Sequence, residues 1–223
     1  ALRNFAQAKQ WYQKALDISL QLAKTGSPDT VRDLAVGYAD MSRACAALGQ
    51  IEEARKWSLC AVGIKERLAE NASPEALRDL GISYFLLGEL GRAERSLGEA
   101  RKWYLKCADV RQKLVGKSAS TDVLRGLADV SGRLGELYQA EKNLFEARNW
   151  YSSQQRILLR LPRTEDIKTK LVKNYDALAM ILLDQNRVAQ AENSLSKGID
   201  IARELAQENG NPDNMETLAL LCY

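Results

Sequence analysis

The sequence has no histidine, and its 223 residues include only 4 cysteines. Without histidine the chain lacks the commonest general base and cannot complete a zinc site of mixed ligands. The sequence also has no glycine-rich phosphate loop and no HExxH-like pattern. The cysteines show no paired short spacing of the kind that metal sites use; they are Cys45, Cys60, Cys107 and Cys222. We therefore predict that the chain is not an enzyme and has no catalytic residue, metal site or cofactor.

A strong charge of one sign and long apolar runs are also absent. Lys and Arg number 32 against 29 Asp and Glu, giving a formal net charge of +3. The charges are dispersed, whereas a nucleic-acid-binding protein gathers cations on one face. No run approaches the ~18 apolar residues of a membrane span, and no secretion signal follows Ala1. We predict no nucleic-acid or membrane partner and, from the unpaired thiols, a cytoplasmic protein.

One motif recurs along the chain, an alanine followed three residues later by tryptophan. The alanines Ala8, Ala54, Ala100 and Ala147 are followed by Trp11, Trp57, Trp103 and Trp150, which are all the tryptophans of the protein. Subtraction of their numbers gives spacings of 46, 46 and 47 residues. A fifth copy has Ala191, with Ser194 in place of tryptophan. Such regular spacing predicts a structural unit that repeats and stacks on itself.

Each unit is predicted to contain two helices. Apolar residues recur three, four and seven positions after the motif alanine, which is the spacing of one buried helix face. About twenty residues after each motif alanine comes a start signal for another helix, with a capping oxygen and often proline at the first helical position. We expect helices of roughly 18 to 22 residues, with Gly49 in one of the turns. The start signals are Ser27-Pro28-Asp29, Ser73-Pro74-Glu75, Thr121-Asp122, Thr164-Glu165-Asp166 and Asn211-Pro212-Asp213.

Small residues are expected where the two helices of a unit meet. We predict that Ser42, Gly88, Gly135 and Ala179 of the first helices face Ala54, Ala100, Ala147 and Ala191 of the second helices. An aromatic residue often follows four positions after the alanine, as at Tyr12, Tyr104 and Tyr151. A further small residue follows at Ala15, Ala61 or Cys107.

These positions resemble the tetratricopeptide repeat over nearly the whole chain. Two features depart from that family: its usual period is 34 residues, and the proline that commonly ends its second helix is replaced, by Glu66 in one copy. The resemblance implies an all-α fold, an α-solenoid of stacked antiparallel helix pairs forming a superhelix. Armadillo- or HEAT-like solenoids are the structural alternative.

The repeat boundaries follow from the two helix signals. We predict a single solenoid over residues 1–223. Residues 1–26 would be the second helix of a truncated repeat, and residues 211–223 the start of another. The complete repeats between them would be 27–72, 73–119, 120–163 and 164–210.

We interpret the tryptophans Trp11, Trp57, Trp103 and Trp150, with the alanines Ala54, Ala100, Ala147 and Ala191, as structural contacts between repeats. A helical residue three positions beyond the contact alanine lies on the face that meets other helices. The alternative is an exposed aromatic ladder that stacks bases or sugars.

In tetratricopeptide proteins the first helices line a concave groove, so the resemblance implies that non-core positions of these helices bind a ligand. Arg32, Arg78 and Arg125 share one column and could hold an acidic segment through charge-assisted hydrogen bonds. Phe85 is the best candidate for an apolar anchor. The full set of candidates is Arg32, Asp40, Arg43, Arg78, Phe85, Glu89, Arg92, Arg125, Asp129, Arg133, Glu136, Lys173 and Asp176.

Three functions remain open. We favour a non-enzymatic scaffold that binds a protein or peptide, possibly an acidic segment, in the groove. The second is a sensor or regulatory segment of a larger bacterial signalling or defence protein, because both ends fall inside predicted repeats. The third is self-assembly through uncapped repeat ends, which expose apolar faces.

Overall fold

A computed structural model describes residues 2–70 and 73–209, and within these ranges the chain is helical with short connections and no strand. The predicted helix start at Asn211 and the position of Cys222 lie outside the described residues. No helix among the described residues is long and apolar enough to cross a membrane. The helices are α1 (Leu2–Ala23), α2 (Pro28–Ala47), α3 (Ile51–Ala69), α4 (Pro74–Ala93), α5 (Leu97–Lys117), α6 (Thr121–Ala140), α7 (Leu144–Leu158), α8 (Glu165–Asp184) and α9 (Val188–Asn209).

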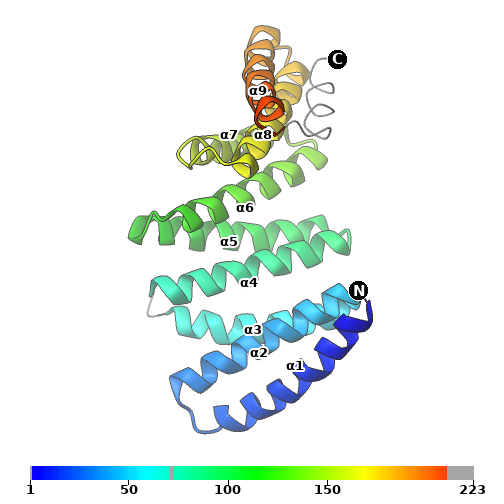
Figure 1. Ribbon diagram of the computed structural model, residues 1–223, viewed down its shortest axis with the longest axis vertical. Helices are drawn as coiled ribbons and strands as arrows, with labels where there is room; N and C mark the ends of the chain where they lie inside the picture. The colour runs from blue at the N-terminus through cyan, green and yellow to red at the C-terminus, as the bar shows by residue number, and fades with distance from the viewer. Residues whose placement is uncertain (1, 71–72, 210–223) are drawn as a thin grey trace. The chain divides into compact units, whose positions relative to one another are not determined.

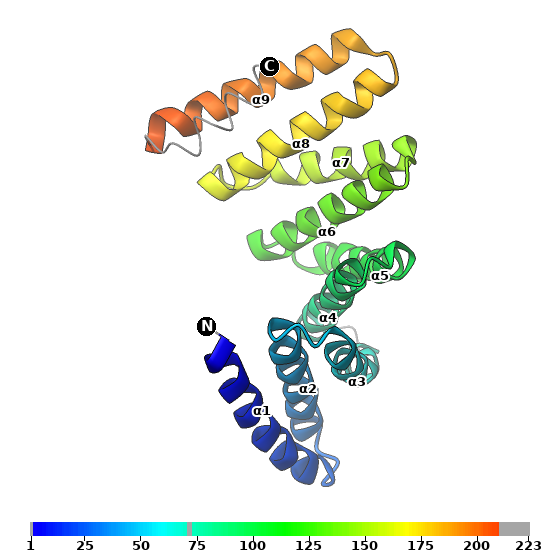
Figure 2. The ribbon, with the colours of Figure 1, turned by 90° about the vertical axis from the view of Figure 1, so that its right-hand side faces the viewer.

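The chain divides into two compact units, Ala1–Ser118 and Ala119–Tyr223. In the first unit α2 packs on α3 and α4 on α5, while α1 packs on α2 and α3 on α4. In the second unit α6 packs on α7, α8 on α9, and α7 on α8. Within each unit the helices follow one another in chain order, as Figure 1 and Figure 2 show. The predicted all-α architecture of adjacent antiparallel helix pairs is confirmed.

The first helices of the complete pairs begin at the predicted signals. α2, α4, α6 and α8 start at residues 28, 74, 121 and 165, so by subtraction their starts are 46, 47 and 44 residues apart. Ser73 caps α4 by accepting a hydrogen bond from the Ala76 amide at 3.2 Å. The side chains of Ser27 and Thr164 make no such bond, although both residues occupy the N-cap position. Proline and the first-turn acids therefore mark these starts more generally than the capping oxygen does.

The same turn joins the two helices of each pair. In the α4–α5 turn Arg95 has a φ of 57°, and the amide of Ser96 donates to the Gly91 carbonyl at 2.8 Å. This hydrogen bond reaches back five residues and supplies a donor to the Gly91 carbonyl, which has no donor within the helix because the helix ends here. The corresponding positive-φ residues are Gly49, Lys142 and Asn186. The predicted turn at Gly49 is one case of a geometry in which non-glycine residues also occur.

One helix is shorter than the sequence led us to expect. α7 has 15 residues and ends at Leu158, whereas we predicted helices of roughly 18 to 22 residues. Pro162 follows four residues later. Proline has no amide hydrogen for a helix interior and disfavours helical backbone at the residue before it. The α7–α8 connection therefore begins early.

Small residues bring the helices of a pair together. In the α8–α9 pair the predicted Ala179 and Ala191 belong to one buried cluster, but in the α4–α5 pair the contact lies one turn away from the predicted one. A Cβ atom on Gly88 would lie 2.4 Å from Cε1 of Tyr104, so the tyrosine ring occupies the space above this glycine. The motif alanine Ala100 is instead met by Gly91, whose Cβ would lie 2.8 Å from the Ala100 amide nitrogen. The prediction that Gly88 faces Ala100 was wrong by one helical turn.

Two tryptophans pack against a tyrosine of their own helix pair, Trp57 stacked and Trp103 tilted. Trp57 on α3 stacks on Tyr38 of α2, with ring centroids 5.7 Å apart. Trp103 on α5 lies at the same distance from Tyr84 of α4 and is 8% exposed. Trp11 on α1 is 69% exposed. We assigned contacts between repeats to the tryptophans Trp11, Trp57, Trp103 and Trp150 and to the alanines Ala54, Ala100, Ala147 and Ala191. The four alanines are fully buried. The contacts between repeats stay a prediction for both sets.

We predict that Trp103→Ala lowers the free energy of unfolding by ~3 to 5 kcal/mol, because truncation leaves a cavity over Tyr84. Trp11→Ala is the matched control, and its cost should be below about 0.5 kcal/mol, as at other exposed sites. Urea denaturation of both variants measures the difference. Equal losses would contradict a core role for Trp103.

Candidate functional site

In the first unit, two of the candidate residues are free to bind a ligand. Arg32 on α2 and Arg78 on α4 are exposed, and neither makes an ion pair with another described residue. Asp40 and Arg43 also lie on α2, but they form an ion pair with each other. Exposed pairs of this kind contribute ~0 to 1 kcal/mol to stability. They neutralise each other, whereas Asp33 beside Arg32 and Asp79 beside Arg78, like the two arginines, form no ion pair with a described residue.

Two other candidates on α4 are held by Tyr104 of α5. The Phe85 and Tyr104 ring centroids are 5.6 Å apart, and the rings are tilted by 51°. The Tyr104 hydroxyl donates a hydrogen bond to the Glu89 carboxylate. Phe85, Glu89 and the neighbouring candidate Arg92 are all half-buried. Phe85 is thus fixed in orientation and still presents part of its ring to solvent.

Sequence reasoning missed Lys65, which lies beneath Arg32. This lysine of α3 is 8% exposed and donates to the Ser83 hydroxyl of α4 at 3.0 Å. It lines a cavity of about 10 Å³ together with Arg32 and Asp79. Among the described residues Lys65 makes no ion pair. Its position on the buried stripe of Ala61, Ile64 and Leu68 is a signal in the sequence that could have identified it.

Burial lowers the pKa of the Lys65 amine below its ordinary value of 10.5. The Asp79 and Asp40 charges oppose this shift, and the Arg43 charge adds to it. A lysine that is buried without an ionic partner destabilises the fold in its charged form.

We predict that Lys65→Met stabilises the protein at pH near 7 by on the order of 1 kcal/mol, because the buried charge is removed. The folded protein binds fewer protons than the unfolded chain between the lowered pKa and 10.5. The wild type therefore gains stability as pH rises through this window, and the advantage of the variant shrinks. Urea denaturation at about pH 7 and about pH 10 measures both effects.

Lys168→Met is the control for this experiment. Lys168 is 5% exposed and forms ion pairs with Glu208 at 2.7 Å and Glu204 at 3.6 Å. Its removal breaks these pairs and should give no gain in stability. A loss of stability in Lys65→Met as large as that in Lys168→Met would contradict our account of Lys65.

In the second unit three of the six candidate residues have ion-pair partners. Asp129 on α6 pairs with Lys170 of α8 at 2.9 Å. Burial alone would lower the pKa of Lys170, but the hydrogen bonds and charges of Asp129 and Asp166 raise it. Arg133 and Glu136 pair within α6 at 3.1 Å. These contacts hold α6 against α8 or neutralise its surface.

Three candidates of the second unit have no such pair. Lys173 and Asp176 on α8 are exposed, and neither forms an ion pair within the described part of the chain. Arg125 on α6 is half-buried, and its Nε finds no hydrogen-bond acceptor among the described residues. The prediction that Arg32, Arg78 and Arg125 form one binding column stays a prediction, because Arg125 belongs to the other compact unit.

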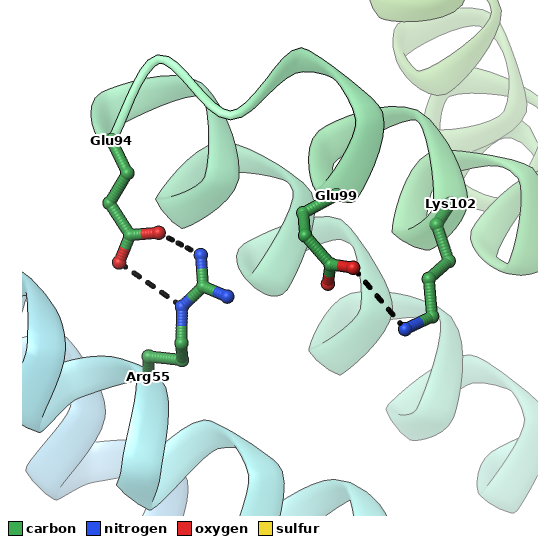
Figure 3. A network of polar contacts seen from close by, with 4 residues as sticks. All are labelled: Arg55, Glu94, Glu99 and Lys102. Atoms are coloured by element: carbon green, nitrogen blue, oxygen red, sulfur yellow. Dashed lines mark hydrogen bonds and ion pairs between the residues drawn. The ribbon is translucent and has the colours of Figure 1, made fainter.

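The second helices of the first unit carry an ordered set of charges. Arg55 on α3 forms two hydrogen bonds with the carboxylate of Glu94, the C-cap residue of α4; its Nε donates at 3.1 Å. Figure 3 shows this pair beside the Glu99 and Lys102 pair of α5, whose N–O distance is 3.5 Å. These arrangements leave little unopposed charge on this face.

Lys106 of α5 belongs to the same ordered set. Its ammonium lies 3.2 Å from the Glu66 carboxylate and 5.0 Å from the centroid of the Trp103 ring. A hydrogen bond from Tyr84 lowers the pKa of Glu66, and Lys106 adds to this effect. Arg55 with Glu94 and Lys106 with Glu66 thus form ion pairs on the Trp103 side of α3 and α5, and Glu66, Tyr84 and Lys106 also line a pocket of about 350 Å³ there.

Comparison with known proteins gives matches by structure and none by sequence. No protein-family model matches the chain, and a search of curated proteins finds no match either. BtubC (BKLC) from P. vanneervenii is 15% identical over 93% of this chain and 94% of that chain, with a TM-score of 0.65. The nuclear import adaptor Nro1 of S. pombe is 18% identical, covers 95% and 74%, and has a TM-score of 0.62.

The description of a third matching structure states its repeat type. The putative kinesin light chain of Podosopora anserina, described as having nearly identical TPR-like repeats, is 17% identical over 94% of this chain and 95% of that chain, with a TM-score of 0.59. At such identities the likeness concerns the fold. The chain therefore has a tetratricopeptide-like fold of adjacent antiparallel helix pairs.

Proposed function

We propose that the protein is a binding scaffold whose first unit holds an acidic segment of a partner protein along α2 and α4. The observation that carries this proposal is the pair of exposed arginines, Arg32 and Arg78, on two successive first helices. Each guanidinium offers a planar set of donors that matches a carboxylate. Asp40 and Arg43 on the same surface are already paired with each other, and a ligand carboxylate would compete with Asp79, which lines the cavity beside Arg32.

Lys65 and Phe85 would extend the site on either side of these arginines. Lys65 lines the small cavity beneath Arg32 and adds a cation that has no ion pair among the described residues. Phe85 offers the partly exposed edge of a ring that Tyr104 holds in place. Interfaces draw much of their affinity from such fixed aromatic and arginine side chains. The expected ligand is an extended segment with acidic residues and an apolar side chain.

We predict that Arg32→Glu plus Arg78→Glu weakens binding of a fluorescein-labelled peptide rich in Asp and Glu by about tenfold or more. Each substitution would remove a charge-assisted hydrogen bond to the ligand and place a carboxylate against the acidic peptide. Fluorescence anisotropy at low and high salt measures the effect, and binding to the wild type should weaken with salt.

Lys56→Glu plus Arg67→Glu is the matched control, because it removes the same formal charge from exposed positions of α3. This variant should bind nearly as the wild type does. Equal weakening in both double variants would mean that net charge acts instead of a site. Undiminished binding by the Arg32 and Arg78 variant would exclude these helices as the binding surface.

Self-association is a second candidate function, and one observation favours it. Trp11 and Ile18 on α1 are 69% and 61% exposed, and Leu22 is 50% exposed. Residues at these spacings lie on one face of a helix. An apolar face of this kind is typical of a contact with another helix, here supplied by a second copy of the chain.

We predict that the wild-type protein forms oligomers with rising concentration, and that Trp11→Glu plus Ile18→Glu returns it to a monomer. Light scattering over a range of concentrations measures the mass. Leu59→Glu, at an exposed apolar residue of α3, is the control and should leave association unchanged. A wild-type protein that stays monomeric at every concentration would refute this candidate.

A further inference from the structure

A pocket of about 300 Å³ lies in the second unit between α7 and α9, with α8 as its floor. Tyr175, Leu178 and Leu182 of α8 form the apolar part of its lining. Arg148 of α7 and Lys197 of α9 lie at its edge, together with uncharged polar side chains. No acidic residue in the described part of the chain lines this pocket. The pocket therefore combines an apolar floor with two cations.

The corresponding place in the first unit is filled by a tryptophan. Trp103 follows the motif alanine Ala100 by three residues and packs on Tyr84. In the second unit Ser194 follows Ala191 by the same three residues. Tyr175 stands on α8 where Tyr84 stands on α4, since each is the tenth residue after the helix start at 165 or 74. The pocket thus occupies the position of a side chain that this repeat lacks.

The two cations have also lost their acidic partners. Arg55 of the first unit pairs with Glu94, the C-cap residue of α4. Arg148 occupies the same place after its motif alanine, but the C-cap residue of α8 is Gln185, which is uncharged. Arg148 makes no ion pair with any described residue.

Lys197 shows the same change. It corresponds to Lys106, since each follows its motif alanine by six residues. Lys106 pairs with Glu66, whereas the residue twelve positions after Ala147, as Glu66 is after Ala54, is Leu159, the C-cap residue of α7. Lys197 therefore has no ion pair within the described ranges. The second unit thus differs from the first at three separate positions around the pocket. It has Ser194 where the first unit has Trp103, Gln185 where it has Glu94, and Leu159 where it has Glu66.

The serine that replaces tryptophan is fully accommodated by its surroundings. The Ser194 hydroxyl is buried and donates to the backbone carbonyl of Tyr175 at 2.9 Å. A buried hydroxyl with a hydrogen bond does not incur the desolvation cost of an unpaired one. The open pocket is consequently compatible with a well-packed helix pair.

We propose that this pocket between α7, α8 and α9 binds an aromatic ring that carries or adjoins a carboxylate. The ring would lie over Tyr175, as Trp103 lies over Tyr84 in the other unit. The carboxylate would take the place of the missing acids and pair with Arg148 or Lys197. A pocket of this volume is at the lower end of the range for small-molecule sites, which suits a single indole or phenyl group.

This chemistry has two possible sources, a free aromatic carboxylate or an aromatic residue beside an acid in a peptide. Indole-3-acetate represents the first source. A peptide with blocked ends and an internal Glu-Trp-Glu sequence represents the second. Both should bind saturably to the full 223-residue chain. For the small acid we expect a dissociation constant on the order of 1 mM, the value typical of about a dozen non-hydrogen atoms.

Ser194→Trp is the main test, because it supplies the missing ring from the protein itself. Binding of both probes, followed by saturation-transfer NMR and calorimetry, should be lost, while the thermal midpoint should not fall. Ser196→Trp adds the same side chain at an exposed position of α9 and should bind as the wild type does. A folded Ser194→Trp variant that binds both probes normally would overturn the proposal.

Gln185→Glu tests the charge without filling the pocket. The new carboxylate should pair with Arg148 and weaken binding of indole-3-acetate by about tenfold, with little effect on indole-3-acetamide. If Gln185→Glu leaves the ratio of the dissociation constants of indole-3-acetate and indole-3-acetamide unchanged, the proposal is overturned. A wild-type protein that binds neither indole-3-acetate nor the peptide would also overturn it. Binding of indole-3-acetate alone would assign a free ligand, and tighter binding of the peptide would assign a protein segment.

Discussion

The close approach of the two helices in each pair is the constraint on which the rest of the structure depends. Gly88 leaves room for the ring of Tyr104, since any Cβ atom there would overlap the ring. Gly135 does the same for Tyr151 in the second unit, where a Cβ would lie 2.8 Å from Cδ1. Protein interiors are packed too tightly to absorb such an overlap without a shift of the backbone. The glycine and the tyrosine together set the distance between the helices.

The fixed tyrosines also determine which acids on the surface are available. The hydroxyl of Tyr104 holds Glu89, and that of Tyr84 holds Glu66. Burial raises the pKa of Tyr84, and the hydrogen bond to Glu66 raises it further. Both carboxylates are therefore held by hydrogen bonds within the first unit. The exposed cations Arg32 and Arg78 have no comparable link to the core, which is why they can serve a ligand.

Local signals in the sequence were sufficient to place most helices. The proline at residue 28 or 74 and the following acid act within one turn, so no knowledge of the fold is needed to recognise them. The end of α7 was misjudged because Pro162 acts on residues before it. The contact of Gly88 was assigned one turn away from its partner, because spacing along the chain does not give the rotation of one helix against another.

The candidate site was less accessible to sequence reasoning because pairing between helices decides which charges are free. Asp129 and Lys170 are 41 residues apart and meet only after α6 and α8 have packed. Lys65 lies on the buried stripe of α3, so its helical position indicated burial, but its contact with Ser83 of α4 could be seen only in the structure. Spacing identified the helix faces correctly. It did not show which members of a face are neutralised.

The architecture also explains why one repeat can lose its tryptophan without losing its structure. The packing of Trp103 on Tyr84 takes place inside one helix pair, so its counterpart can be removed without disturbing the glycine and tyrosine contacts of another pair. In a repeat protein each unit interacts only with its neighbours, and a vacancy therefore has a local cost. Ser194 reduces this cost further by its hydrogen bond to the carbonyl of Tyr175. A repeat with serine at the tryptophan position can therefore keep an open pocket at little cost to the neighbouring helix pairs.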